Sequence, residues 1–432
     1  MRARQVTTRV GRRRRLLAAA VAAALVLAAC RDDGASDDAD QEPAATSPTE
    51  ATADDGEAGG TDGFPAGVAV LAADDDLYAL AEDLGPGEPG QPIAVQAVDA
   101  GLDATVWRVL HHSRSLDGED IAVSGLVAVP EGEPPKDGRP VASWAHGTTG
   151  IADECAPSRT LELAAANPLL ARGMVVVATD YEGLGTPGRH PYLVGESQGR
   201  GVLDVVRAAQ ALGPAIGAGE QVVLWGHSQG GHAVLFANEI AAEWAPELEV
   251  VGTVAGAPPS QLPLMADFIG DGPGGFFLAM VVAGWAEAYD ELDPADVLTP
   301  TGLERLDAVD DGCVRHVAET WGAPTTEDLI RPEGAEAEPW PRLFVENDPG
   351  RRAGTSPVLV IHGGQDEIVP VVTSGLLVDG MCRVGQPVQR LVYDDADHTS
   401  VVPSSLGDML DWIDDRLAGQ PAPDDCAAAG GG

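Results

Sequence analysis

Lysine is nearly absent from this chain of 432 residues, since Lys136 is the only one. Lysine and arginine together number 26, against 68 aspartates and glutamates, and the formal net charge is −42. A surface of that sign repels the phosphates of nucleic acids and of anionic lipids. We therefore exclude nucleic-acid binding as the main function.

Apolar runs long enough to span a membrane are absent as well. Leu16–Ala29 contains only Leu, Ala and Val, but it is fourteen residues long and follows an arginine-rich stretch. A spanning helix needs about 20 apolar residues, so residues 1–30 are predicted to be a secretory signal peptide. Leu27-Ala28-Ala29-Cys30 resembles the lipobox of bacterial lipoproteins, which predicts lipidation of Cys30. The alternative is an ordinary signal peptide that is cut near Ala29.

Large apolar side chains are missing from the next segment, residues 31–63. It is rich in Asp, Glu, Ala, Gly, Thr and Pro and cannot form a core, so we predict a disordered acidic linker. A lipid anchor followed by such a linker would hold a globular domain, residues 64–432, off a membrane. We expect the protein to be secreted or anchored to the outer face of the cell membrane.

Cysteine is also scarce, with five in the whole chain. A lipidated Cys30 would leave four, an even number that suits disulfides in an oxidising compartment. These four are Cys155, Cys313, Cys382 and Cys426, and the sequence alone allows three pairings. No two are spaced as CxxC, which argues against a zinc or redox site.

Short apolar runs alternate with helical patterns through most of the globular domain. Apolar runs without polar alternation are typical of a parallel sheet buried on both faces, so we predict an α/β fold. The predicted strands are Thr105–His112, Ile121–Val129, Val141–Ala145, Met174–Thr179, Gln221–Trp225, Leu248–Ala255, Pro357–Ile361 and Val388–Tyr393. The predicted helices are Leu161–Arg172, Gly201–Leu212, His232–Trp244 and Leu406–Leu417.

The alternation stops between about residues 260 and 346. We predict that this stretch is an insertion packed over the sheet as a cap or lid. Phe276, Phe277 and Trp285 could pack this cap or line a pocket for a long acyl chain, and we favour packing.

The pattern GxSxG, which is typical of a nucleophilic serine, occurs around Ser197 and around Ser228. A nucleophile elbow needs a strand before the serine and small residues after it, because the following helix packs tightly on the sheet. Ser228 follows an apolar run and precedes two glycines, whereas bulky Arg200 follows Ser197. We therefore predict Ser228 as the nucleophile and Ser197 as the cap of a helix that starts near Gly201.

A serine nucleophile requires a base and an acid that orients it. In this kind of fold the chain order is Ser, acid, His. Asp366 lies in the turn after a predicted strand, and His398 is the only histidine that follows it. We predict Asp366 as the acid, with Glu367 and Asp397 as its rivals, and His398 as the base.

Backbone N–H groups must also stabilise the oxyanion. One donor is expected from Gln229, directly after the nucleophile. The second is expected from the loop after Val141–Ala145, where we assign Thr148, with Gly147 as the nearest rival. No metal or organic cofactor is required.

Three blocks together resemble the secretory lipase family of α/β-hydrolases: residues 144–158, 180–192 and 226–232. The resemblance covers roughly residues 105–417. It implies an α/β-hydrolase fold, a mostly parallel sheet flanked by helices, with a cap over an acyl pocket. It also implies Ser228, Asp366 and His398 as the triad, and the disulfides Cys155–Cys313 and Cys382–Cys426.

We therefore expect an extracytoplasmic serine ester hydrolase, a lipase or carboxylesterase, that acts on small-molecule or lipid esters through an acyl-enzyme. Two alternatives remain. The same fold and triad could cleave peptide or amide bonds, or the chain could be a non-catalytic surface lipoprotein.

Overall fold

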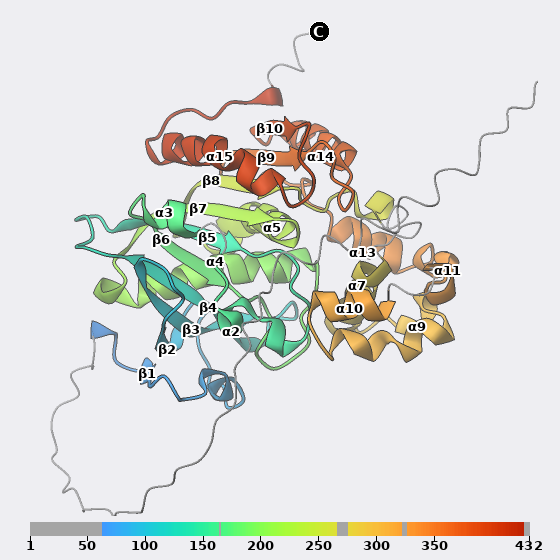
Figure 1. Ribbon diagram of the computed structural model, residues 1–432, viewed down its shortest axis with the longest axis horizontal. Helices are drawn as coiled ribbons and strands as arrows, with labels where there is room; N and C mark the ends of the chain where they lie inside the picture. Colours follow the sequence, from blue (N-terminus) through green and yellow to red (C-terminus); the bar gives the residue numbers. More distant parts are fainter. Residues whose placement is uncertain (1–62, 164–165, 266–274, 322–325, 427–432) are drawn as a thin grey trace, which may run out of the picture. The chain divides into compact units, whose positions relative to one another are not determined.

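The computed structural model describes residues 63–163, 166–265, 275–321 and 326–426 (Figure 1). The predicted signal peptide, Cys30 and all but the last residue of the predicted linker lie outside the described residues. The globular domain can therefore be compared with its predicted strands, helices and cap.

A ten-stranded sheet forms the centre of the domain, in the order β1-β2-β3-β4-β6-β5-β7-β8-β9-β10. In this order the strands from β6 to β10 pair in parallel, as do β1 and β2, while the pairs β2–β3, β3–β4 and β4–β6 are antiparallel. The bounds are β1 Ala69–Leu71, β2 Pro92–Val98, β3 Ala104–Arg114, β4 Asp120–Pro130, β5 Arg139–Ala145, β6 Val175–Thr179, β7 Ala218–His227, β8 Glu249–Gly256, β9 Val358–Gly363 and β10 Val388–Tyr393. The predicted α/β class with a mostly parallel sheet is confirmed.

Helices cover both faces of this sheet (Figure 1). Helices α4 (Gly195–Ala211), α5 (Gln229–Trp244) and α14 (Val371–Arg383) contribute buried side chains to the core on one face. Helices α3 (Ala166–Leu170) and α15 (Val401–Leu417) do so on the other. Two buried cores of aliphatic side chains thus hold the strands in place.

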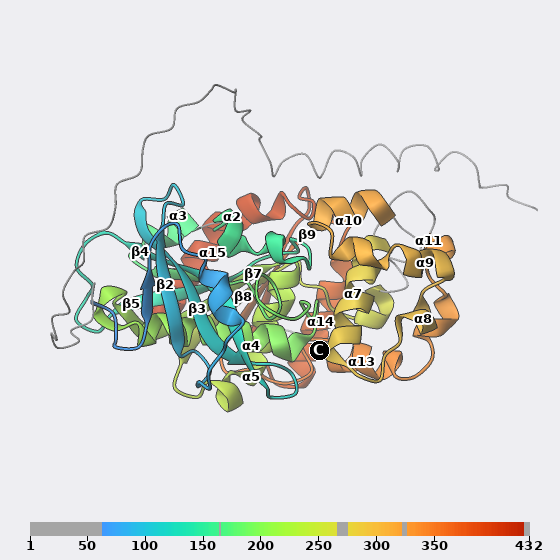
Figure 2. The same cartoon turned by 90° about the horizontal axis from the view of Figure 1, so that it is seen from below.

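The predicted cap is present as a group of helices at one end of the domain (Figures 1 and 2). It has a core of its own, in which Trp285, Trp321 and Trp340 are fully buried and the rings of Trp285 and Trp340 are stacked. Its helices are α7 Gly275–Ala288, α8 Pro294–Val297, α9 Pro300–Glu304, α10 Val314–Trp321, α11 Thr326–Leu329, α12 Pro332–Ala335 and α13 Trp340–Glu346. Apolar packing alone therefore explains much of the aromatic content of this insertion.

All eight predicted strands are present. One helix prediction is wrong, and the other three helices form but begin earlier than predicted, with α5 at Gln229 and α15 at Val401. The predicted helix Leu161–Arg172 does not form as one element, because Leu161 is left-handed, with φ 57°, and ends the short helix α2 (Pro157–Thr160). Helix α4 begins at Gly195, well before the predicted start near Gly201. Ser197 therefore lies inside α4 and does not cap it; its hydroxyl donates to the Glu182 carboxylate.

Two disulfides are present, with the pairing that the family resemblance implies. Cys155–Cys313 joins the loop region after β5 to the residue before α10 of the cap. Cys382–Cys426 ties the end of the described chain to α14. The first of these links the cap covalently to the sheet domain.

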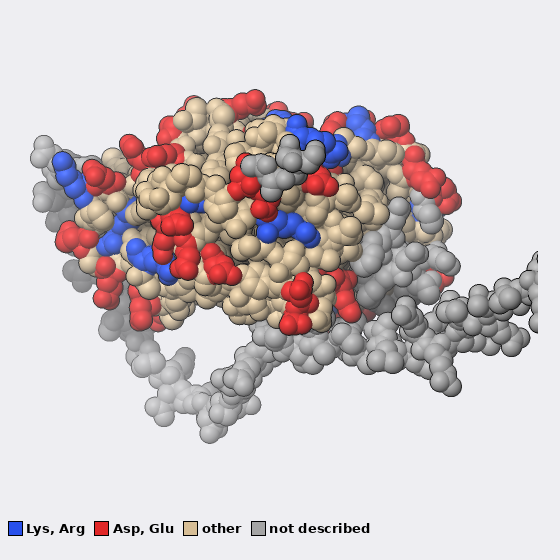
Figure 3. Space-filling model, turned by 90° about the horizontal axis from the view of Figure 1, so that it is seen from above, with Lys and Arg blue, Asp and Glu red and all other residues tan. Residues whose placement is uncertain are grey.

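Acidic side chains are spread over the face of the molecule shown in Figure 3, with fewer basic groups between them. This distribution agrees with the net charge of −42. Among the described residues, no helix is both long enough and apolar enough to cross a membrane.

Candidate active site

Ser228 lies in a sharp turn between the end of β7 and the start of α5. Its backbone has φ 58° and ψ −122°, a conformation that L-residues adopt rarely and at a cost of about 1–3 kcal/mol. Its N–H donates to the carbonyl oxygen of Gly256 at 2.8 Å. Ser228 remains partly exposed, whereas the residues on either side of the elbow in β7 and α5 are largely buried. The turn thus presents one hydroxyl group at the end of the sheet.

Glycines make this turn possible. A Cβ on Gly230 would lie 1.9 Å from the carbonyl oxygen of Ala145 in β5. A Cβ on Gly226 would lie 2.2 Å from the carbonyl oxygen of Gly230, and one on Gly231 would lie 2.7 Å from that of Gly256. These contacts are with backbone atoms, which cannot move aside cheaply. The helix therefore approaches the sheet at a distance that only glycine allows.

Asp366 and His398 are joined by a hydrogen bond. His398 Nδ1 donates to Asp366 Oδ2 at 2.7 Å. The other carboxylate oxygen, Oδ1, accepts the N–H groups of Ile368 and Val369 at 2.9 and 2.8 Å. Burial raises the pKa of the Asp366 carboxyl, but the hydrogen bonds from His362 and His398 outweigh burial and hold it well below its usual value. Asp366 is therefore an anion that fixes the orientation of the His398 ring.

Tight contact between two loops brings Asp366 to His398. A Cβ on Gly363, at the end of β9, would lie 2.5 Å from the carbonyl oxygen of Ala396. The N–H of Gln365 donates to that same carbonyl at 2.9 Å, and the N–H of Gly364 donates to Tyr393 at 2.8 Å. The loops after β9 and β10 are thus held together, which sets the position of Asp366 relative to His398.

The imidazole of His398 lies beside the nucleophile turn. Its ring centroid is 4.6 Å from that of His227, the residue directly before Ser228. Burial is the main cause that lowers the pKa of His227 to about 3, and the neighbouring His398 lowers it further. The His398 ring, which is hydrogen-bonded to Asp366, therefore lies next to the turn that carries Ser228.

The loop after β5 packs against the same turn. A Cβ on Gly147 would lie 3.4 Å from the carbonyl oxygen of His227 and 3.8 Å from the Cβ of Ser228. Gln229 is the first residue of α5, where the backbone N–H has no partner within the helix. Thr148 lies next to Gly147, beyond the end of β5. Gln229 and the loop that contains Gly147 and Thr148 thus lie on two sides of the turn at Ser228.

An apolar cavity of about 50 Å³ opens at Ser228 between the sheet domain and the cap. Phe277 and Trp285 from the cap and Ile368 and Val369 from the loop after Asp366 contribute to its wall. The sequence favours packing of the cap over lining of a pocket for Trp285. In the structure Trp285 does both, since it stacks on Trp340 and also lines this cavity.

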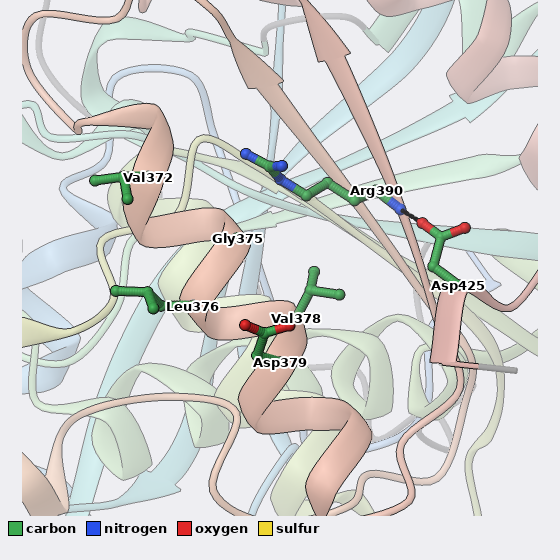
Figure 4. A pocket seen from close by; sticks show the side chains of 7 residues that line it. All are labelled: Val372, Gly375, Leu376, Val378, Asp379, Arg390 and Asp425. Atoms are coloured by element: carbon green, nitrogen blue, oxygen red, sulfur yellow. Dashed lines mark hydrogen bonds between the residues drawn. The ribbon is translucent and has the colours of Figure 1, made fainter. Parts of the chain in front are cut away.

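A second, larger groove of about 470 Å³ lies between α14 and β10 (Figure 4). It contains no predicted site residue. Its one cationic side chain, Arg390, already donates to Ser374 Oγ at 3.0 Å and to the Val371 carbonyl at 2.8 Å. Asp425 accepts the backbone N–H of Arg390 at 2.8 Å. The polar groups of this groove thus join α14, β10 and the chain end to one another.

The sequence did not identify His362 as a partner of the acid. Its Nε2 donates to the Val369 carbonyl at 2.9 Å and lies 3.4 Å from Asp366 Oδ2. The spacing of four residues between His362 and Asp366 was the only local signal. Within the described residues, no group of three or more His, Cys, Asp and Glu side chains is arranged to hold a metal ion.

Comparison with known proteins gives a consistent picture. A family model described as "Secretory lipase" matches residues 156–425. A probable inactive lipase of Mycobacterium tuberculosis is 27% identical over 395 residues, covering 82% of this chain and 84% of that protein. A secreted triacylglycerol lipase of Malassezia globosa is 25% identical over 390 residues, with 82% and 81% covered. The crystal structure of Candida antarctica lipase A superposes with a TM-score of 0.69 at 22% identity, covering 79% of this chain and 84% of that one.

Proposed function

Because this chain belongs to the secretory lipase family, we propose that it hydrolyses carboxylic esters through an acyl-enzyme formed on Ser228. The observation that carries the proposal is the 2.7 Å hydrogen bond from His398 to Asp366, beside a serine held at φ 58°. A nucleophilic serine on a strained turn, a histidine and a buried carboxylate are the parts that acyl transfer requires.

The proposed mechanism begins when Ser228 Oγ attacks the ester carbonyl. His398 Nε2 takes the serine proton and then gives it to the leaving alcohol, while the acyl group stays on Ser228. Water, deprotonated by His398, then releases the carboxylic acid and restores the serine. Asp366 keeps the Nδ1 proton of His398 in place, so that Nε2 is free to accept.

The tetrahedral intermediates of both steps carry an oxyanion. We assign its stabilisation to the backbone N–H groups of Gln229 and Thr148, with Gly147 as the alternative to Thr148. The support for this assignment is the packing of the loop after β5 against the Ser228 turn. Removal of one such donor typically costs about 10²–10³-fold in kcat.

The proposed substrates are lipid esters whose acyl chain enters the cavity at Ser228. Apolar side chains dominate its wall, which suits a hydrocarbon chain. Phe277 and Trp285 of the cap lie in this wall beside Ser228, so the cap would contact the acyl chain.

We further propose that the protein acts outside the cytoplasm, attached to the cell membrane through a lipid on Cys30. The signal-like residues 1–30, the lipobox and the acidic linker support this attachment, and the secretory character of the family supports export. A Cys30→Ser variant released into the medium would agree with the anchor, and one that stays with the membrane fraction would contradict it.

The experiment that tests the catalytic proposal compares wild type with Ser228→Ala and Ser197→Ala. Ser197 is the matched control, because it lies in the other GxSxG pattern but inside α4. We expect Ser228→Ala to abolish hydrolysis of p-nitrophenyl butyrate and labelling by a fluorophosphonate probe. Ser197→Ala should retain both.

Retention of ester turnover by folded Ser228→Ala would overturn the assignment. A wild-type protein that cleaves anilides but not esters would favour an amidase. A wild-type protein that neither cleaves esters nor reacts with the probe would favour a non-catalytic role, which the relation to a probable inactive lipase makes worth testing.

A further inference from the structure

His190 is a buried histidine with a hydrogen bond at each ring nitrogen. Nδ1 lies 2.8 Å from the carbonyl oxygen of Glu182, and Nε2 lies 2.8 Å from the side-chain nitrogen of Gln229. The ring is fully buried and stacks on that of Tyr181, with centroids 5.5 Å apart. His190 therefore joins the loop after β6 to the residue that follows the nucleophile.

The partners of His190 determine where its proton lies. A carbonyl oxygen can only accept, so Nδ1 carries the proton and donates to Glu182. Nε2 of the neutral ring is then an acceptor, which receives an N–H from Gln229 Nε2. Burial, as the main cause, lowers the pKa of His190 to about 3, so the ring stays neutral at physiological pH. The direction of both hydrogen bonds is thus fixed.

The second predicted oxyanion donor is held in a similar way, two residues further along. The Tyr192 hydroxyl and Thr148 Oγ1 are hydrogen-bonded at 2.7 Å. Tyr192 is almost completely buried. One short segment, residues 190–192, therefore contacts the side chains of both residues that we assign as oxyanion donors.

We propose that His190 and Tyr192 are positioning residues, which hold Gln229 and Thr148 so that their backbone N–H groups converge on the oxyanion. This inference rests on the proposed function. His190 does not line the cavity at Ser228, whereas Tyr192 does, so the role of Tyr192 is tested by whether its loss changes kcat or KM. Their effect is expected in kcat, because an oxyanion forms only after the ester is bound.

The cap supports this same segment. A Cβ on Gly284 of α7 would lie 2.6 Å from the N of Tyr192 and 2.7 Å from the carbonyl oxygen of His190. Trp285 Nε1, in the next residue, donates to the carbonyl oxygen of Tyr192 at 2.9 Å. Helix α7 therefore packs directly on the backbone of residues 190–192, with no space for a side chain at position 284. The placement of the cap is thereby coupled to the geometry of the oxyanion donors.

Two substitutions at position 190 separate positioning from simple loop anchoring. In His190→Gln the terminal amide can reach the place of Nε2 and accept from Gln229. In His190→Asn the shorter side chain can reach only the place of Nδ1 and donate to Glu182. Both variants lose the stacking on Tyr181, so the loss of the ring is matched between them.

We expect His190→Asn to lower kcat for p-nitrophenyl butyrate by about 10–100-fold, with KM changed by less than about threefold. His190→Gln should recover most of that loss. The concentration of active enzyme is set by fluorophosphonate titration, and thermal melting reports folding. His111→Asn is the control. His111 lies in β3, is as fully buried as His190, and its Nδ1 also faces a backbone carbonyl, that of His112.

Tyr192→Phe and Thr148→Val each remove the hydrogen bond between Tyr192 and Thr148. Both substitutions change few atoms, so they test the inference even if His190→Asn does not fold. Each is expected to lower kcat by about tenfold, and the double variant by about the same factor, because both remove one hydrogen bond. Fully multiplicative losses would contradict the link.

The inference is overturned if His190→Asn and His190→Gln are equally active, or if the loss lies entirely in KM. It is also overturned if His190→Asn and His111→Asn lose the same amount of kcat for each degree by which their melting temperatures fall. Failure of the proposed function looks different: Ser228→Ala would keep ester turnover, or the wild-type protein would fail to cleave esters. An inactive Ser228→Ala together with fully active His190→Asn and Tyr192→Phe would refute the positioning role alone.

Discussion

Replacing Asp366 with asparagine is expected to be far more damaging than its small change in shape suggests. Asp366 Oδ1 accepts two backbone N–H groups, from Ile368 and Val369. In Asp366→Asn only the amide oxygen can accept them, so the amide NH₂ must take the place of Oδ2. That place lies 2.7 Å from His398 Nδ1. The variant therefore presents a donor where the wild type presents an acceptor.

This reversal forces His398 into the other tautomer. Nδ1 must accept from the amide, the ring proton moves to Nε2, and Nε2 can no longer take the proton of Ser228. A triad histidine held in the wrong tautomer costs about 10⁴-fold in kcat, which corresponds to about 5.5 kcal/mol of transition-state stabilisation. The fold should survive, because both backbone hydrogen bonds to position 366 are kept.

The assay measures kcat for p-nitrophenyl butyrate and the rate of fluorophosphonate labelling, with thermal melting as the control for folding. Glu367→Gln is the matched substitution, since Glu367 is the adjacent acid and is exposed. Asp397→Asn tests the other rival, whose Oδ1 accepts N–H groups from Thr399 and Ser400 before α15. Asp366→Asn activity within tenfold of wild type, or an equal loss in Glu367→Gln, would refute this reasoning.

Two further predictions concern stability. Gly230→Ala should give little soluble, active protein, because the new methyl group would lie 1.9 Å from the Ala145 carbonyl oxygen. Gly407→Ala, at an exposed position of α15, is the control and should raise the free energy of unfolding by about 0.5–1 kcal/mol. Normal yield and activity of Gly230→Ala would contradict the close packing at Gly230. Burial raises the pKa of Glu239 from 4.5 to about 7. Between these two pH values the folded protein keeps a proton on Glu239 that the unfolded chain has released. The free energy of unfolding therefore falls as the pH rises from 4.5 to 7. Glu239→Gln keeps an acceptor for the Gly350 N–H. Measured by urea denaturation, it should raise the free energy of unfolding by about 1–3 kcal/mol at pH 8 but little at pH 4.5. An equal effect at both pH values would argue against a buried charge.

The strands and the elbow could be predicted because their signals are local. The residues from Val222 to Trp225 are buried on both faces of the sheet, and such strands are apolar without interruption. The glycines after Ser228 indicate that α5 packs closely on the sheet. In the structure a side chain at Gly230 would collide with the carbonyl oxygen of Ala145. His398 could be selected because few histidines follow Ser228 in the chain. These inferences require only spacing and order.

Helix α4 shows why its start could not be predicted. Gly195 and Gly199 disfavour a helix by intrinsic propensity, and the sequence predicts a helix only from Gly201 onward. In the structure a Cβ on Gly195 would lie 2.3 Å from the ring of Phe236 in α5, and one on Gly199 would lie 3.0 Å from the N of Ala237. Here the glycines permit two helices to pack closely, and tertiary packing outweighs propensity.

The contacts of His190 were hidden for a different reason. Its partners Glu182 and Gln229 lie 8 and 39 residues away in the chain, and the link to Gln229 exists only once the sheet has assembled. No periodic pattern reports such a contact. The two missed strands, β1 and β2, belong to the edge that precedes the first predicted strand, and β1 is only three residues long.

The bond between Cys155 and Cys313 fixes one side of the cap to the loop that carries Thr148. The N–H of Val314 also donates to the Thr149 carbonyl at 2.7 Å. Any swing of the cap to admit a bulky ester must therefore pivot about this corner, and the entrance must widen on the opposite side. Synthesis in a reducing cytosol would leave this corner held only by the Val314–Thr149 hydrogen bond and by packing.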